Sequence, residues 1–310
     1  PRGPPGSRKG LTGRMGTMNI YLESLRPRQW TKNLLLMAGV IFAQLLHDTA
    51  CVLRAVAGVV VFCLASGVIY IFNDIADREL DRLHPYKKRR PIASGRLAVR
   101  DAARFGLVLL VVVLGAAFLL GTPFMGGVAF FFLWNWLYTR YLKKVPILDV
   151  TGIGMSFVIR AVSGILVLLP VMPHVRLSPW LLLCTFFLSL FLGFSKRREE
   201  YIKLHEGDGK TRPVLRGYTE PMLNSLIGAS FALTGMAYAL YTVWPATVEL
   251  FGTRDLIYTL PFVLVGMGRY LYLVFLEDKG GKPHEILLTD LALQAVVLGW
   301  IVAAVRIIGV

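Results

Sequence analysis

Long apolar runs dominate the chain, and each is close to the length of a membrane-spanning helix. A bilayer core about 30 Å thick needs about 20 apolar residues in helical form. By this measure the sequence predicts nine spans, at residues 30–47, 53–73, 102–120, 123–140, 146–169, 177–195, 219–244, 253–276 and 285–308. The motif Gly-Thr-Pro at 121–123 interrupts an otherwise uncharged stretch and predicts a tight hairpin. The pattern is that of an all-α, polytopic membrane bundle.

The composition agrees with this pattern. The 310 residues are 55% hydrophobic and 17% charged, whereas soluble domains carry about 25% charged residues. The formal net charge is +15, and in so apolar a chain we interpret the basic excess as a topology signal and an attraction for anionic partners. No basic-aromatic module typical of nucleic-acid binding is visible. The cysteines and histidines show no metal-binding spacing.

The basic residues are distributed unequally between the two sides of the predicted bundle. The N-terminal segment and alternate loops, near 74–101, 140–145, 196–218 and 277–284, carry 27 Lys and Arg residues. The opposite connections carry Arg54, Arg176, Arg254 and Arg306. Because cytoplasmic loops are enriched in Lys and Arg, we expect the N-terminus in the cytoplasm and the protein in the cell inner membrane.

The domain organisation predicted from this reasoning is simple. Residues 1–17, rich in Gly, Pro and Arg, are expected to form a flexible tail. Residues 18–310 are expected to form one transmembrane domain. Its polar loops, 74–101, 138–146, 195–218 and 268–285, would gather on the cytoplasmic face and build an active site there.

An acidic motif follows the second predicted span. Asp74, Asp77 and Asp81 are spaced i, i+3 and i+7, which predicts one face of a helix. Carboxylates stacked in this way repel one another unless a cation holds them, and oxygen ligands, including that of Asn73, suit Mg²⁺. The alternative is a solvated helix end whose carboxylates pair with neighbouring arginines.

A basic loop comes directly after the acidic motif and contains Lys87, Lys88, Arg89 and Arg90. A divalent metal beside Lys and Arg favours a polyphosphate ligand, since metal and basic side chains share its charge. The alternative is a polybasic loop that holds anionic lipid headgroups.

Other candidates lie within or beside the spans. Asp149 and Arg160 are eleven residues apart and near one helix face, so we expect them to line the site, with a structural ion pair as the alternative. Further candidates at the cytoplasmic mouth are Lys32, Tyr138 and Arg140. We interpret His84 as a structural residue. For Arg269 and Asp290, an ion pair or a side chain that reaches the membrane surface is as good an explanation as a catalytic role.

The stretch NDIADRELDRLHPYKKRRPIASGRL, residues 73–97, resembles the first motif of the UbiA superfamily of intramembrane prenyltransferases. The resemblance extends over nearly the whole chain from about Ser24. Typical members carry a second aspartate-rich motif, but here the corresponding stretch is GFSKRREE, with Lys196, Arg197 and Arg198. A second magnesium site of the usual kind is therefore not expected, and a second bound anion is. With residues 267–290, this stretch resembles the decaprenyl-phosphate phosphoribosyltransferase branch.

That resemblance implies a reaction and a set of roles. The enzyme would transfer 5-phosphoribosyl from phosphoribosyl diphosphate to a polyprenyl phosphate, release diphosphate, and supply cell-wall arabinan synthesis. Mg²⁺ would be held by Asn73 and by three aspartates, Asp74, Asp77 and Asp81, which would be the catalytic residues. The basic loop at 87–90 would bind donor phosphates, and residues 196–198 either the donor 5-phosphate or the lipid phosphate. Membrane lipids are further partners, nucleic acid is not, and homo-oligomerisation is left open.

Two rival functions remain. The first is an aromatic prenyltransferase of the same fold that uses an isoprenyl diphosphate, against which the missing second aspartate motif argues. The second is a transporter of lipid phosphates. Transporters usually place polar sites near the midplane, often within internal repeats, whereas here the charges gather at one face and no convincing repeat is visible.

Overall fold

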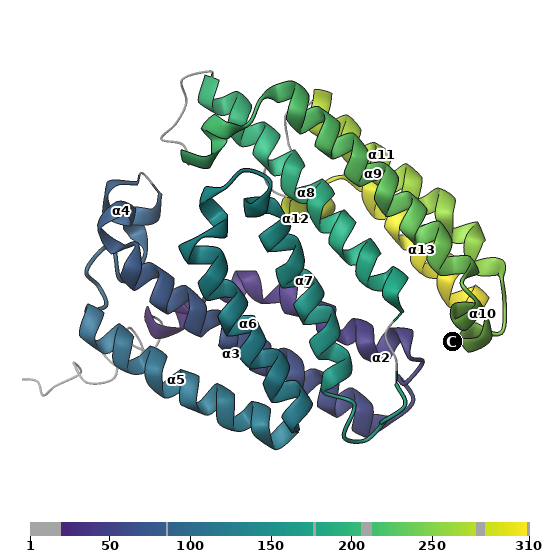
Figure 1. Ribbon diagram of the computed structural model, residues 1–310, viewed down its shortest axis with the longest axis horizontal. Coiled ribbons are helices and arrows are strands. Elements are labelled where there is room, and N and C mark those ends of the chain that lie inside the picture. The colour runs from purple at the N-terminus through teal and green to yellow at the C-terminus, as the bar shows by residue number, and fades with distance from the viewer. Residues whose placement is uncertain (1–19, 85, 176–177, 206–212, 277–282, 309–310) are drawn as a thin grey trace, which may run out of the picture.

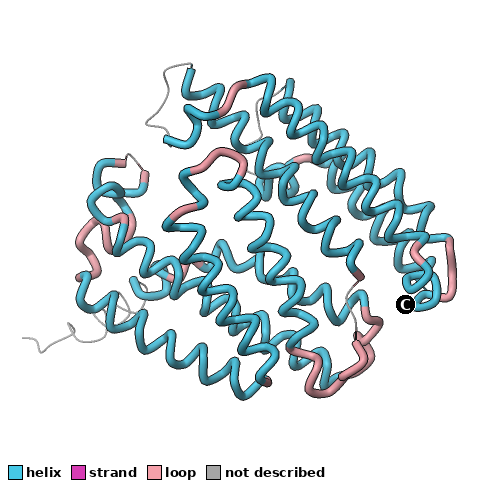
Figure 2. Tube along the Cα trace, viewed as in Figure 1, coloured by secondary structure: helices cyan, strands magenta, loops and turns pink. Residues whose placement is uncertain are grey.

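The computed structural model describes residues 20–84, 86–175, 178–205, 213–276 and 283–308. Within these ranges the protein is helical and contains no β-strand, as predicted (Figure 2). The tail expected at residues 1–17 lies outside the described residues. The α-helices are α2 (Ala38–Phe42), α3 (Thr49–Ala76), α4 (Arg78–Leu83), α5 (Val99–Leu120), α6 (Thr122–Arg140), α7 (Leu148–Leu166), α8 (Pro179–His205), α9 (Glu220–Val243), α10 (Pro245–Phe251), α11 (Leu260–Leu276), α12 (Pro283–Thr289) and α13 (Leu291–Ile308). Short 3₁₀-helices are η1 (Pro27–Met37), η2 (Lys87–Arg89), η3 (Leu142–Lys144), η4 (Pro213–Gly217) and η5 (Asp255–Thr259).

Seven helical segments of the described chain are long and apolar enough to cross a bilayer. They are Thr49–Ala76, Val99–Leu120, Leu148–Leu166, Pro179–His205, Glu220–Val243, Asp255–Leu276 and Leu291–Ile308. The other two predicted spans are not among these seven segments. Residues 30–47 contain η1 and α2, and residues 123–140 lie in α6. The count of nine spans therefore stays a prediction.

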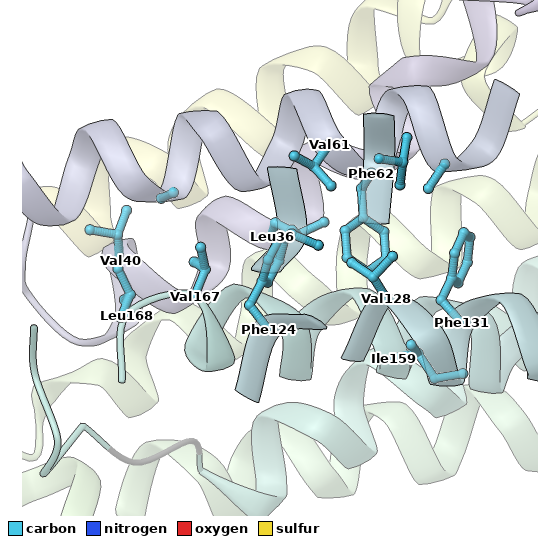
Figure 3. Packing of buried hydrophobic residues seen from close by; sticks show 14 of the residues in the cluster. Leu36, Val40, Val61, Phe62, Phe124, Val128, Phe131, Ile159, Val167 and Leu168 are labelled. Carbon is cyan, nitrogen blue, oxygen red and sulfur yellow. The ribbon is translucent and has the colours of Figure 1, made fainter. Parts of the chain in front are cut away.

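The helices form two packed halves, visible in Figure 1 as the purple-to-teal and the green-to-yellow parts. In the first half, α3, α5, α6 and α7 enclose a core in which the Phe62 ring lies 5.9 Å from Phe124 and 5.0 Å from Phe131 (Figure 3). In the second half, α8, α9, α11 and α13 share another core, to which α7 contributes Val150. Helix α7 thus joins the halves.

The polar 3₁₀ segment η1 crosses α7 at very close range. A Cβ atom at Gly164 would lie 2.2 Å from the backbone oxygen of Leu36, and one at Gly39 would lie 2.5 Å from the backbone oxygen of Gly164. Only glycine permits this approach. The crossing brings Asn33 of η1 against the middle of α7, where the site begins.

Near the N-terminal end of α3, the side chain of Arg54 binds the C-terminal ends of two neighbouring helices. Its Nε donates to the backbone oxygen of Val167, just after α7, at 3.0 Å, and its Nη2 donates to that of Leu120, the last residue of α5. The final carbonyls of a helix have no partner within the helix. A cation beside them is favourable because the C-terminal end of the helix dipole is negative. Arg54 therefore fastens α3, α5 and α7 together at this end.

The basic loop after α4 is folded onto the bundle. Ile92 and Leu97 are buried in a small apolar cluster with Leu25, Ile71 and Ala102. Arg96 adds a two-pronged ion pair with Glu23, at 2.8 and 2.9 Å. The backbone of this loop is consequently fixed beside the end of α3.

Candidate functional site

Two buried carboxylates face each other where α3 gives way to α4. Asp74 lies in the last turn of α3 and Asp81 in α4, and their side chains are 5% and 3% exposed. Nη1 of Arg90 donates to both, at 3.0 Å to Asp74 Oδ1 and 2.6 Å to Asp81 Oδ2. Arg26 also donates to Asp74, and Nζ of Lys87 lies 3.7 Å from Asp81 Oδ1. We call Asp74 and Asp81 the carboxylate pair.

The third aspartate of the motif points elsewhere. The helix is interrupted at Asp77, whose backbone (φ −93°, ψ 7°) ends α3 and starts α4, so the prediction of one continuous helix face is wrong. The Asp77 carboxylate is 41% exposed and lies 3.8 Å from Nζ of Lys143. Asn73, the fourth predicted ligand, is half-buried in the preceding turn.

The carboxylate pair suits a magnesium ion that arrives with phosphate. Among the described residues, no group of three or more His, Cys, Asp or Glu side chains is arranged to hold a metal. The pair instead offers two hard oxygen donors that converge on one cationic nitrogen. Mg²⁺ is commonly held by one or two carboxylates plus substrate phosphates. Asp74 and Asp81 therefore fit Mg²⁺ bound to a diphosphate better than the predicted four-residue cage.

The members of the predicted basic loop differ in their surroundings. Lys87 and Arg90 contact the carboxylate pair, whereas Lys88 and Arg89 are exposed. The Nδ1 atom of His84 accepts from the backbone nitrogens of Tyr86 and Lys87, at 3.2 and 3.4 Å. This contact fits the structural role predicted for His84.

A second group of charges is cationic and lies next to the first. Arg160 is buried, and its Nε donates to Asn33 Oδ1 at 2.8 Å while its Nη1 donates to Ser156. Its guanidinium lies 4.7 Å from the centre of the Phe131 ring. Within the described chain, Arg160 forms no ion pair with a carboxylate, so the alternative of an Asp149–Arg160 pair is wrong.

Desolvation of Lys32 by the surrounding protein, together with the positive charges of Arg160, Lys196 and Arg26, lowers the pKa of Lys32 to about 8. We call these four residues the cation cluster. Arg26 links the cluster to the carboxylate pair, since it bonds Asp74 and stacks 4.7 Å from the centre of the Tyr70 ring. Positive charges concentrated in this way favour an anionic ligand.

Asp149 belongs to a buried network. Its Oδ2 accepts from Arg197 Nε and its Oδ1 from the hydroxyl of Tyr218, both at 2.6 Å, and the Asp149 and Arg197 side chains are 1% and 2% exposed. Arg197 also donates to Glu200 at 2.6 Å. The Tyr218 hydroxyl accepts from the backbone nitrogen of Ile147. Burial, strengthened by the bond to Asp149, raises the pKa of Tyr218, which keeps the hydroxyl a donor.

The last basic residue of the predicted anion-binding run also has internal partners. Arg198 is buried, donates to Asn224 Oδ1 at 2.9 Å and to the backbone oxygen of Val274 at 3.2 Å, and stacks on Phe275. Of residues 196–198, Lys196 is the one that belongs to the cation cluster. The contacts of Arg197 and Arg198 support a structural role, and their predicted phosphate binding stays a prediction without support from geometry.

The surroundings of Tyr138, Arg140 and Arg269 complete the set of residues considered from the sequence. Tyr138 packs on α7, where a Cβ atom at Gly152 would lie 2.6 Å from its ring, and Arg140 is exposed at the end of α6. Arg269 pairs with Asp290 at 2.7 Å, one of the roles expected for them.

Sequence reasoning missed Asn33, and it assigned Arg26 with Lys32 to an interfacial entry and not to contact with the aspartates. Arg26 occupies a left-handed backbone conformation (φ 53°, ψ 63°) directly before Pro27, and its long-range partner Asp74 is invisible in the sequence. Asn33 carried a signal, since it is a polar residue inside an apolar run, and such residues usually face a cavity or partner.

Comparison with known proteins defines the class. Residues 34–286 match the UbiA prenyltransferase family. The chain therefore belongs to this family, and its apolar helices together with this membership make it an integral membrane protein. It is 32% identical to the decaprenyl-phosphate phosphoribosyltransferase of Corynebacterium glutamicum, over 90% of this chain and 84% of the relative. It is also 32% identical to the enzyme of that name from Mycobacterium tuberculosis, over 90% of this chain and 91% of the relative.

A solved structure supports the fold. The structure of a UbiA homologue from Archaeoglobus fulgidus bound to GPP and Mg²⁺ superposes with a TM-score of 0.68 and covers 94% of this chain and all of that one, at 20% identity. At this identity the likeness establishes the shared helical architecture.

Proposed function

We propose that the protein transfers 5-phosphoribosyl from phosphoribosyl diphosphate to a polyprenyl phosphate and releases diphosphate. The observation that carries the proposal is the buried carboxylate pair beside a cation cluster, which together match a metal-bound diphosphate and a second anion. The names of the relatives from C. glutamicum and M. tuberculosis support the transfer of a phosphoribosyl group to a polyprenyl phosphate.

The carboxylate pair would hold Mg²⁺, and the metal would neutralise charge on the departing diphosphate. Arg90 and Lys87, already at the pair, would bind diphosphate oxygens. The cation cluster would hold the phosphate of the lipid close to the ribose. Holding both reactants in this way replaces a bimolecular encounter in solution by an oriented reaction within one site.

The chemistry is a substitution at ribose C1. The bond from C1 to the diphosphate oxygen breaks, a bond from C1 to a lipid phosphate oxygen forms, and the anomeric configuration inverts. The attacking phosphate is already ionised near neutral pH, so no side chain needs to remove a proton. This agrees with the loop-capping contacts of His84.

The same proposal includes the setting of the reaction. We infer one transmembrane domain over residues 18–310, in the inner membrane, with the site on the cytoplasmic side, because the loops rich in Lys and Arg gather at that end. The product would feed the synthesis of cell-wall arabinan.

The test incubates purified protein with radiolabelled phosphoribosyl diphosphate, a polyprenyl phosphate and Mg²⁺. We expect a labelled product that extracts into organic solvent and disappears when EDTA is added. A parallel reaction offers an isoprenyl diphosphate and an aromatic acceptor. Product only in that parallel reaction would favour an aromatic prenyltransferase, and movement of lipid phosphate across vesicles without any product would favour a transporter.

A further inference from the structure

Arg90 occupies the position between the two carboxylates that a metal ion would need. One nitrogen, Nη1, donates to both Asp74 and Asp81. The oxygen atoms that would coordinate Mg²⁺ are thus the same atoms that now accept from a guanidinium. A divalent ion bound between these two oxygens would take the space that Arg90 Nη1 fills, and the two cations would repel each other.

A metal that enters alone would leave Arg90 without an anionic partner. The Arg90 side chain is only 28% exposed, and a partly buried charge that loses its partner is strongly unfavourable. A metal that enters with diphosphate brings a new partner for the displaced guanidinium, since Arg forms strong, often two-pronged bonds with phosphate oxygens.

The surroundings allow the side chain to move while the backbone stays. Arg90 follows the single turn of η2, and the residues after it are anchored by the buried side chains of Ile92 and Leu97. Arg26 differs, because it also stacks on the Tyr70 ring and can remain on Asp74. The exchange therefore requires a rotation of one long side chain.

We propose that Arg90 is a positioning residue that exchanges the carboxylate pair for the diphosphate when the metal complex binds, and so makes the site accept metal with diphosphate rather than metal alone. This inference rests on the proposed function, since it assumes the metal-diphosphate site. Metal and diphosphate then bind cooperatively, and Arg90 carries part of the coupling free energy.

The experiment measures binding of Mn²⁺, a spectroscopic substitute for Mg²⁺, to the purified full chain by electron paramagnetic resonance of the free ion. Titrations are run with and without inorganic pyrophosphate. We expect pyrophosphate to tighten Mn²⁺ binding to the unsubstituted protein by between about 5-fold and 150-fold, the usual range of coupling between sites. In Arg90→Ala we expect tighter binding of Mn²⁺ alone and a smaller effect of pyrophosphate.

Two further variants separate this role from a merely structural one. Arg90→Lys keeps a cation and is expected to retain part of the coupling. Arg104→Ala removes an exposed arginine on α5, whose side chain is 65% exposed, and is expected to match the unsubstituted protein. Thermal unfolding of each variant with and without Mn²⁺ checks folding, and Mn²⁺ should stabilise Arg90→Ala more than the other variants.

The results distinguish the two proposals. If Arg90→Ala binds Mn²⁺ alone no more tightly than the unsubstituted protein and shows the same enhancement by pyrophosphate, the exchange is refuted while the metal site stands. If the unsubstituted protein binds no Mn²⁺ even with pyrophosphate, the metal-diphosphate site fails and the exchange fails with it.

Discussion

The buried pair of Asp149 and Arg197 makes a quantitative prediction possible. Asp149→Asn changes no volume and keeps a group that can bond Tyr218, but it removes the negative charge 2.6 Å from Arg197 Nε. Removing one partner of a buried ion pair costs about 3–5 kcal/mol. Because Glu200 still contacts Arg197, we expect the lower end, about 3 kcal/mol.

With about 2.1 cal/mol/K of unfolding entropy per residue, each kcal/mol lowers the midpoint of thermal unfolding of this 310-residue chain by about 1.5 °C, so the expected fall is about 5 °C. The measurement is thermal unfolding of the purified protein in detergent. Tyr218→Phe removes two hydrogen bonds, one donated to Asp149 and one accepted from the backbone nitrogen of Ile147, and is expected to cost about 1–3 kcal/mol. The double variant Asp149→Asn, Arg197→Gln no longer contains the unpaired charge of Arg197. We therefore expect it to recover at least half of the free energy of unfolding that Asp149→Asn loses. Unchanged melting of Asp149→Asn, or a double variant as unstable as the sum of the singles, would refute the reasoning.

Three further outcomes are expected. Asp74→Asn should lower phosphoribosyl transfer at least about 100-fold, and Asp77→Asn should lower it less because Asp77 is 41% exposed; equal losses in the radiolabel assay would contradict the two-carboxylate site. Gly164→Ala should destabilise the fold by about 1–3 kcal/mol, since the new Cβ would meet the Leu36 carbonyl, whereas Gly115→Ala, which has open space, should not; thermal unfolding compares them. EDTA should abolish transfer and added Mg²⁺ should restore it, and full activity in EDTA would rule out the metal.

The helical architecture was predictable because long apolar runs carry their own evidence. The hairpin predicted at residues 121–123 is found where α5 ends and α6 begins. The first run was harder, since residues 30–47 look like a span but contain Lys32 and Asn33. In the structure, Asn33 accepts a hydrogen bond from Arg160, and the run folds as η1 and α2. Hydropathy alone does not report which polar residue has a partner.

The candidate site was predictable in its residue types more than in its contacts. The acidic and basic motifs do lie together, since Arg90 contacts both Asp74 and Asp81, and their membership of one functional site stays a prediction. The run at 196–198 shows the limit. Three consecutive basic residues on a helix point in different directions, and Arg197 is neutralised by Asp149, 48 positions away in the sequence. A local motif contains no information about such a distant partner.

The contacts of the Arg54 guanidinium limit how the helices of the bundle can move apart. It ties the terminal carbonyls of two helices to a third at the face remote from the acidic motif. A helix held at one end moves most at its other end, and here that other end carries the acidic motif and the basic loop. Any widening that admits the proposed lipid headgroup should therefore begin at the end with the acidic motif and leave the end held by Arg54 closed.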